Sequence, residues 1–157
     1  MRTCAAPAQA EPDVPWTLEL IGSGTLRPTV EARVAGLPAE LAARIAMRGQ
    51  LAAADVAEPR SRSGVFLMTS HAGYEGFPRV LVEALAAGLP AVVTEGADTG
   101  GLMRDGVSGF VRGRDPAELA EAIRHARALD HTRVTDAVAA LSAPRVVREL
   151  FFQNPIE

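Results

Sequence analysis

Short apolar runs alternate with amphipathic segments along most of the chain. Each apolar run ends at a turn-forming residue, as β-strands do, and these runs predict strands at residues 16–21, 44–48, 64–69, 91–94 and 109–111. The run at 64–69 is almost continuously apolar, which is typical of a parallel strand covered on both faces. The segments between the runs predict helices at 28–35, 51–61, 78–87 and 115–129, with one or two more within 132–152.

This alternation of strands and helices predicts an α/β fold with a doubly wound, mainly parallel sheet. Two of the predicted helices also carry boundary signals. Pro78 fits the first turn of one helix, and Gly88 fits its end. Asp115 is the predicted N-cap of the other, followed by Pro116 and then by Glu118 as a capping-box partner.

The length of 157 residues indicates a single domain, which we place at residues 16–157. Residues 1–15 hold three prolines and show no helical or strand periodicity, so we interpret them as a flexible leader or a truncation scar. The only cysteine, Cys4, allows neither an intrachain disulfide nor a thiol-based zinc site. We therefore expect a reducing, cytoplasmic location.

The charged residues exclude several classes of function. A net charge of -3 argues against a general nucleic-acid binder. All 16 basic residues are arginine, and a chain without lysine cannot be a P-loop NTPase or form the Schiff base of a pyridoxal enzyme.

Ligands of a doubly wound sheet bind beyond the carboxyl ends of its strands. The loops expected to share this edge follow Ile21, Arg48, Thr69 and Thr94. The first of these loops, residues 22–24, begins like a dinucleotide-binding fingerprint, but Arg27 stands where the third glycine belongs. We interpret this loop as a tight turn from strand to helix.

The loop at residues 70–78 leads into a predicted helix and carries the most informative side chains. The N–H groups and positive dipole end of a helix N-terminus form a natural phosphate site. Because a carboxylate repels phosphate, Glu75 and Glu83 suit another group, and the neutral hydroxyls of a sugar or ribose fit them. A structural interpretation stays open, in which Glu83 lies on the solvent-facing stripe of the helix and Glu75 supports the helix start.

The same stretch resembles the Glu-x7-Glu signature of the retaining GT-B glycosyltransferases of family 4, the glycosyl transferases group 1. The residues that fit this signature are Ser70, Glu75, Gly76, Phe77, Glu83, Ala84, Ala86, Gly88 and Pro90. Residues 20–24, 47–49, 99–102 and 105–110 resemble glycine-containing segments of the same family. The resemblance covers residues 16–129 and implies the Rossmann-like C-terminal half of a GT-B fold.

The resemblance implies the donor-binding half of an enzyme that transfers a sugar from a nucleotide diphosphate with retention of configuration. Glu75 would be the catalytic residue that contacts the donor sugar, and Glu83 would bind the ribose hydroxyls. The other candidate site residues, around the sugar, diphosphate and base, are Gly22, Arg48, Gly49, Gln50, His71, Gly76, Phe77, Pro78, Gly100 and Gly101. Such enzymes are metal-independent, so we expect no metal and no cofactor besides the donor substrate.

Two features of the family are missing from the sequence. We find no Gly-Arg…Lys-Gly segment to bring two cations to the diphosphate, although Arg79 is a candidate substitute. We also find no acceptor-binding N-terminal domain, so we expect transfer to need such a domain or a partner chain. UDP-sugars are favoured over GDP-sugars as donors, for polysaccharide or glycolipid synthesis with an unknown acceptor.

Other functions stay open on the sequence alone. They are a non-catalytic nucleotide-sugar-binding module, an oxidoreductase cofactor domain and an inactive fragment. Peripheral membrane association of the full enzyme also stays open. His125 and His131 lie on or beside a late charged helix, and we interpret them as surface residues.

Overall fold

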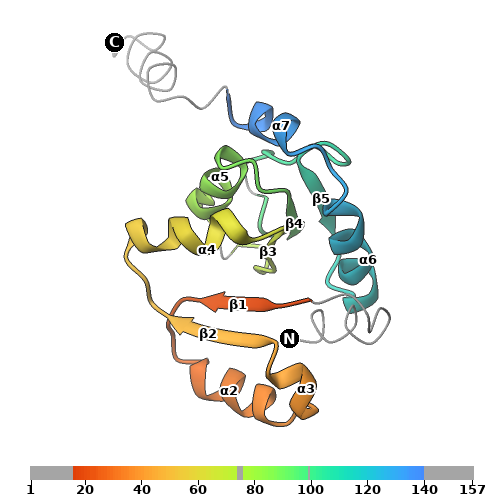
Figure 1. The fold of residues 1–157 in the computed structure, drawn as a ribbon. Helices are drawn as coiled ribbons and strands as arrows, with labels where there is room; N and C mark the ends of the chain where they lie inside the picture. Colours follow the sequence, from red (N-terminus) through yellow and green to blue (C-terminus); the bar gives the residue numbers. More distant parts are fainter. Residues whose placement is uncertain (1–15, 74–75, 99, 140–157) are drawn as a thin grey trace.

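A computed structural model describes residues 16–73, 76–98 and 100–139 of the chain. Strands and helices alternate along this part (Figure 1), in the order β1 (Leu18–Ile21), α2 (Arg27–Ala35), α3 (Ala39–Ala42), β2 (Ile45–Gly49), α4 (Ala57–Arg62), β3 (Phe66–Met68), α5 (Arg79–Ala86), β4 (Ala91–Thr94), β5 (Gly109–Arg112), α6 (Pro116–Ala126) and α7 (His131–Val134). Short 3-10 turns lie at Ala53–Val56 and Thr135–Ala137. The predicted leader at 1–15 and the predicted helical residues beyond 139 lie outside the described residues.

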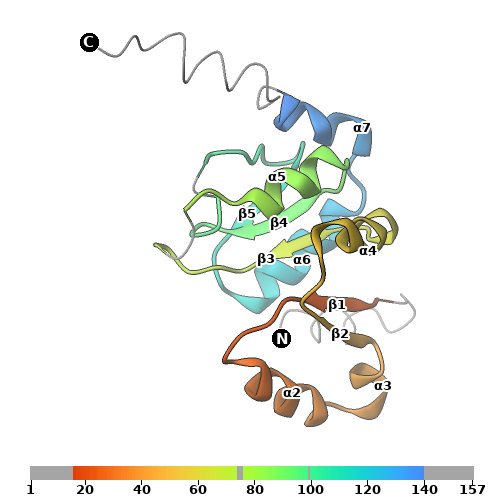
Figure 2. The same cartoon turned by 90° about the vertical axis from the view of Figure 1, so that its left-hand side faces the viewer.

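Every strand pair in the structure is parallel, which confirms the predicted α/β class. The strands form two sheets, β1–β2 and β3–β4–β5, and the expectation of one sheet is wrong for the described part of the chain. β1 lies on the side of the smaller sheet that faces β3 (Figures 1 and 2). The expectation rested on the alternation of strands and helices, which does not show which strands are hydrogen-bonded neighbours.

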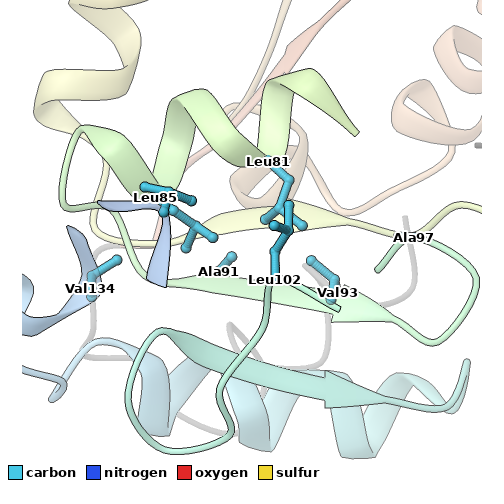
Figure 3. Packing of buried hydrophobic residues seen from close by; sticks show 8 residues of the cluster. Leu81, Leu85, Ala91, Val93, Ala97, Leu102 and Val134 are labelled. Carbon is cyan, nitrogen blue, oxygen red and sulfur yellow. The ribbon is translucent and has the colours of Figure 1, made fainter. Parts of the chain in front are cut away.

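The core of the larger sheet lies on both of its faces. On one face, Leu81 and Leu85 of α5 pack against Ala91 and Val93 of β4 (Figure 3). On the other face, Val92 packs with residues of α6, namely Leu119, Ala122, Ile123 and Ala126. Because successive residues of a strand point to opposite faces, β4 contributes to both clusters and is buried along its whole length. Helices therefore cover both faces, as a doubly wound arrangement requires.

The N-cap Asp115 and the end of α5 at Gly88 are confirmed, whereas Pro78 is the N-cap of α5 and not a first-turn residue, and no capping-box bond from the Glu118 side chain is found among the described residues. The Asp115 carboxylate accepts hydrogen bonds from the N–H groups of Ala117 and Glu118, at 2.9 and 3.1 Å, and Pro116 is the first helical residue. At the end of α5, the N–H of Gly88 donates to the Leu85 carbonyl at 3.0 Å. The four-residue helix α3 was not predicted, because so short a segment shows no periodicity.

The smaller sheet is less buried than the larger one. Helices α2 and α3, which accompany it, contain no buried residue. Trp16, just before β1, connects this part to the second cluster, and the Arg127 guanidinium lies 4.7 Å from the centre of its indole ring. A second connection is electrostatic, because Arg62 of α4 forms an ion pair with Glu19 of β1.

The Glu19 carboxylate accepts hydrogen bonds from two arginines. The bond from Arg62 lowers the pKa of Glu19 most; burial acts in the opposite direction, and Arg48 lowers it further. A carboxyl group whose pKa is lower in the folded chain stabilises the fold above its ordinary pKa, and this contribution is lost as the pH falls. The contribution of Glu19 is therefore complete above about pH 4.5 and decreases below it.

We predict that Glu19→Gln weakens the dependence of stability on pH in acid. Between about pH 7 and about pH 3, the free energy of unfolding of the wild type should fall more than that of the variant. Urea denaturation followed by circular dichroism at a series of pH values measures both slopes. Glu40→Gln, an exposed carboxylate of α3, is the control and should follow the wild type. Equal slopes for Glu19→Gln and the wild type would show that the lowered pKa of Glu19 does not contribute to the loss of stability in acid.

Candidate functional site

The loops after β1 and β2 lie against each other. The N–H of Gly22 donates to the Gly49 carbonyl at 2.7 Å, and the Ser23 hydroxyl donates to the side-chain oxygen of Gln50 at 3.1 Å. Three predicted site residues, Gly22, Gly49 and Gln50, are therefore brought together. A side chain on Gly49 would meet Arg27, whose Nη1 lies 3.2 Å from the position of a Cβ atom.

Arg48 is also at this edge, but its side chain has a partner within the sheet. Its guanidinium donates to Glu19 of the neighbouring strand β1 at 3.1 Å. This pair could not be predicted from the sequence, because it joins residues 29 positions apart. The resemblance implies that the backbone of residues 48–50 faces the nucleotide base, and this side-chain pair does not occupy that backbone.

The loops after β3 and β4 form a second group. The Thr94 hydroxyl donates to the Ser70 carbonyl at 2.6 Å. A Cβ atom on Gly96 would lie 2.2 Å from the backbone nitrogen of Ala72 and 2.4 Å from the carbonyl carbon of His71. Only glycine permits so close an approach of two backbones. His71, a predicted site residue, is exposed on this loop.

The start of α5 meets the loop at residues 98–102. Atom Cε2 of Phe77 lies 3.3 Å from the position of a Cβ atom on Gly100. Phe77 is 56% exposed, although it is a large apolar residue, whereas the adjacent Pro78 is buried. The predicted residues Phe77, Pro78 and Gly100 therefore gather at one place on the surface.

Main-chain donors are present at this place. Within residues 16–73, 76–98 and 100–139, no side chain is seen to cap α5, and the N–H groups of Phe77 and Gly100 have no acceptor. The N–H of Gly101 is already used, because it donates to the Asp98 carbonyl at 3.3 Å. The Asp98 carboxylate also accepts from the N–H of Leu102 at 2.8 Å, which holds the loop in shape. The loop thus offers Gly100, rather than Gly101, as a main-chain donor.

Glu83 lies on the side of α5 that is turned away from the core residues Leu81 and Leu85. Its carboxylate oxygen Oε2 is 2.7 Å from Nη2 of Arg60 in α4, and its side chain is 43% exposed. Glu83 is therefore ion-paired and half exposed. It is not the fully solvated carboxylate that the solvent-facing interpretation of this residue describes. No motif predicted Arg60, since an ion pair between two helices leaves no periodic signal.

The two groups of loops are connected through α4. Among the described residues, no hydrogen bond or ion pair joins the group around Gly49 directly to the group around Phe77. Instead, Arg62 of α4 reaches Glu19 in the smaller sheet, and Arg60 reaches Glu83 on α5. α4 therefore fixes Glu83 relative to β1.

The remaining predictions have mixed outcomes. Glu75 lies outside the described residues, so its catalytic role stays a prediction. Gly76 and Arg79 are exposed, and His125 and His131 are exposed as interpreted. A concave surface of about 410 Å³, which the sequence did not indicate, is lined by Arg112, Glu118, Glu121, Ala122 and His125.

The part of the chain that the structure describes contains neither a metal-binding cluster nor a membrane-spanning helix. In residues 16–73, 76–98 and 100–139, no three His, Cys, Asp or Glu side chains gather so that they could hold a metal ion. In the same residues, no helix combines the length and apolar character needed to cross a membrane.

The comparison with known families gives the decisive observation. The glycosyl transferases group 1 family matches residues 2–128, which is most of the sequence. The chain belongs to this family. Membership in group 1 agrees with the signature around Glu75 and Glu83 and confirms the resemblance seen in the sequence.

A curated polysaccharide biosynthesis protein and several solved glycosyltransferase structures are similar to the chain. The Vi polysaccharide biosynthesis protein VipC/TviE of Salmonella typhi is 35% identical over 92 residues, which cover 59% of this chain and only 15% of that protein. The C-terminal domain of LpcC, a glycosyl transferase group 1 family protein of Francisella tularensis, is 19% identical with a TM-score of 0.73, covering 88% of this chain and 75% of that one.

HepE of Anabaena, solved in complex with UDP-glucose, is 22% identical with a TM-score of 0.70. That match covers 98% of this group 1 chain and 44% of HepE. The structural likenesses show the fold, which is that of the C-terminal domain of GT-B glycosyltransferases.

Proposed function

We propose that this chain is the donor-binding domain of a retaining glycosyltransferase that uses a nucleotide diphosphate sugar, with UDP-sugars preferred to GDP-sugars. The observation that carries the proposal is the proximity of Phe77 and Gly100 at the start of α5, two residues whose N–H groups have no acceptor among the described residues. Family membership supports it. The name of VipC/TviE and the UDP-glucose bound to HepE support a polysaccharide product and a UDP-sugar donor.

The main-chain donors suit the charged part of the donor. The N–H groups of Phe77 and Gly100, with the dipole of α5, would bind the diphosphate and stabilise the negative charge that develops as it leaves. Fixed donors of this kind need no reorganisation during the reaction. The proposal therefore includes no metal and no cofactor.

The carboxylates suit the neutral parts of the donor. Glu83 would accept hydrogen bonds from the ribose hydroxyls, and Glu75 would contact the sugar to be transferred. The backbone of residues 48–50 would face the base. His71 and Gly22, one from each group of loops, are the other residues proposed to contact the donor.

Transfer to an acceptor belongs to the proposal for the whole enzyme. The match to VipC/TviE covers 15% of that protein, and the match to HepE covers 44%. An acceptor-binding domain or partner chain would complete the site, in the cytoplasm, for polysaccharide or glycolipid synthesis. Donor binding is the part of the function that the chain itself can be tested for.

A thermal-shift assay of the 157-residue chain with UDP-, GDP-, ADP- and CMP-sugars tests this proposal. A ligand at one hundred times its dissociation constant should stabilise the fold by about 2.7 kcal/mol. For a domain of this size, that corresponds to a rise in melting temperature of roughly 5–10 °C. UDP-sugars should give the largest shift, and NADH is the negative control. The proposal would be contradicted if NADH alone raised the melting temperature, or if none of the nucleotide sugars raised it.

A further inference from the structure

Arg60 is the partner of Glu83, and the two side chains differ in exposure. The Arg60 side chain is 17% exposed, whereas that of Glu83 is 43% exposed. Nη2 of Arg60 donates to Oε2 of Glu83 at 2.7 Å, a short and charge-assisted hydrogen bond. No hydrogen bond to the other carboxylate oxygen, Oε1, is found among the described residues. One oxygen is thus held by the protein, and the other is available to a ligand.

The helix that carries Arg60 is itself anchored. The Ser63 hydroxyl donates to the Pro59 carbonyl at 2.7 Å at the end of α4, and Pro59 is buried. Arg62, two residues after Arg60, binds Glu19 and also lies 3.0 Å from Glu58. Residues two apart on a helix point in different directions, so Arg60 and Arg62 bind different elements. Because Pro59 is buried, α4 keeps its place without the exposed ion pair of Arg62, and the Arg60 guanidinium is presented to Glu83 independently of that pair.

We propose that Arg60 is a positioning residue for nucleotide recognition. By holding Oε2, it fixes the Glu83 carboxylate in one orientation and leaves Oε1 to accept a hydrogen bond from a ribose hydroxyl. Fixing the side chain before binding reduces the entropy that is lost when the ligand arrives. This inference rests on the proposed function, because it requires that Glu83 meets the ribose.

The same contact has an electrostatic consequence. An isolated carboxylate close to a diphosphate would repel it. The guanidinium beside Glu83 compensates that negative charge, so the carboxylate is compatible with an anionic ligand bound at the start of the same helix. A neutral side chain in place of Arg60 removes both the orientation and the compensation.

The test compares UDP with 2′-deoxy-UDP and 3′-deoxy-UDP, because these probes differ in the ribose hydroxyls alone. Isothermal titration calorimetry of the full chain gives the dissociation constants. In the wild type, UDP should bind about tenfold more tightly than at least one deoxy analogue. In Arg60→Gln this preference should fall to about twofold or less, and Arg60→Lys, which keeps the charge, should restore part of it.

Arg62→Gln is the matched control, because it removes an arginine from the same helix that contacts Glu19 instead of Glu83. It should keep the preference of the wild type for UDP. If Arg62→Gln lost this preference equally, the effect would come from the placement of α4, and the role of Arg60 would be refuted.

The outcomes separate this inference from the proposed function. If wild-type chain binds UDP with a hydroxyl preference that Arg60→Gln retains, the inference fails and the donor-binding proposal stands. Arg60→Gln could also weaken UDP and the deoxy analogues by the same factor. In that case Arg60 has only a structural role, and the inference fails. If the wild type does not bind UDP, both fail.

Discussion

Gly109→Ala is expected to destabilise the fold by at least about 3 kcal/mol, a large part of the stability of a typical domain. Gly109 begins β5 and lies opposite Ala91 of β4. A Cβ atom at this position would lie 1.7 Å from the Ala91 carbonyl oxygen, and the φ angle of +143° is one that other residues rarely adopt. Strand β5 would have to move away from the buried strand β4. Thermal and urea denaturation followed by circular dichroism measure the loss.

Two control variants separate the steric clash from backbone strain. Gly106→Ala has a φ of +73° but meets no atom within 4 Å, so we expect a loss of about 1–2 kcal/mol from strain alone. Gly64→Ala has open space and no unusual φ, and its stability should change by about 0.5 kcal/mol or less. If Gly109→Ala is no less stable than Gly106→Ala, the register of β4 and β5 described above is wrong.

Glu83→Ala is expected to weaken the binding of UDP and of UDP-glucose by the same factor, about 10- to 100-fold. The loss reflects a hydrogen bond from the ligand to a charged acceptor, which contributes about 1.5–3 kcal/mol. The factor should be equal for both ligands because Glu83 would contact the ribose, which they share. Isothermal titration calorimetry of the two ligands measures it, and circular dichroism verifies that the variant is folded.

Glu75→Gln and Glu121→Ala complete this comparison. Glu75→Gln should chiefly reduce the affinity for UDP-glucose, since Glu75 is assigned to the sugar. Glu121→Ala removes an exposed carboxylate of α6 and should change neither affinity. Unchanged affinities in both Glu83→Ala and Glu75→Gln would refute the assigned roles.

Local elements of the fold could be predicted because their signals are contained in a few adjacent residues. The cap formed by Asp115, the Pro116 that follows it, and the apolar run of β4 each report a local preference of the backbone. The division into two sheets could not be predicted in this way. It depends on whether β1 and β3 form hydrogen bonds with each other, and the apolar residues of a strand do not report which strand lies beside it.

The residues of the candidate site also differ in whether the sequence could predict them. The glycines and Phe77 were found because a motif places them at fixed spacing along the chain. Arg60 was missed because its contact with Glu83 spans 23 positions and joins two helices. The approach of Gly96 to His71 is equally invisible in the sequence, where the two residues belong to different loops. Non-local contacts of this kind require the fold.

The central claim is that a nucleotide sugar binds where the start of α5 meets the loop of Gly100. Backbone amide NMR of the isotope-labelled chain during titration with UDP-glucose tests it directly. The largest shifts are expected at Phe77 and Gly100, with further shifts at Gly49 and Gln50. Shifts centred on the concave surface around His125, with none at Phe77 or Gly100, would contradict it.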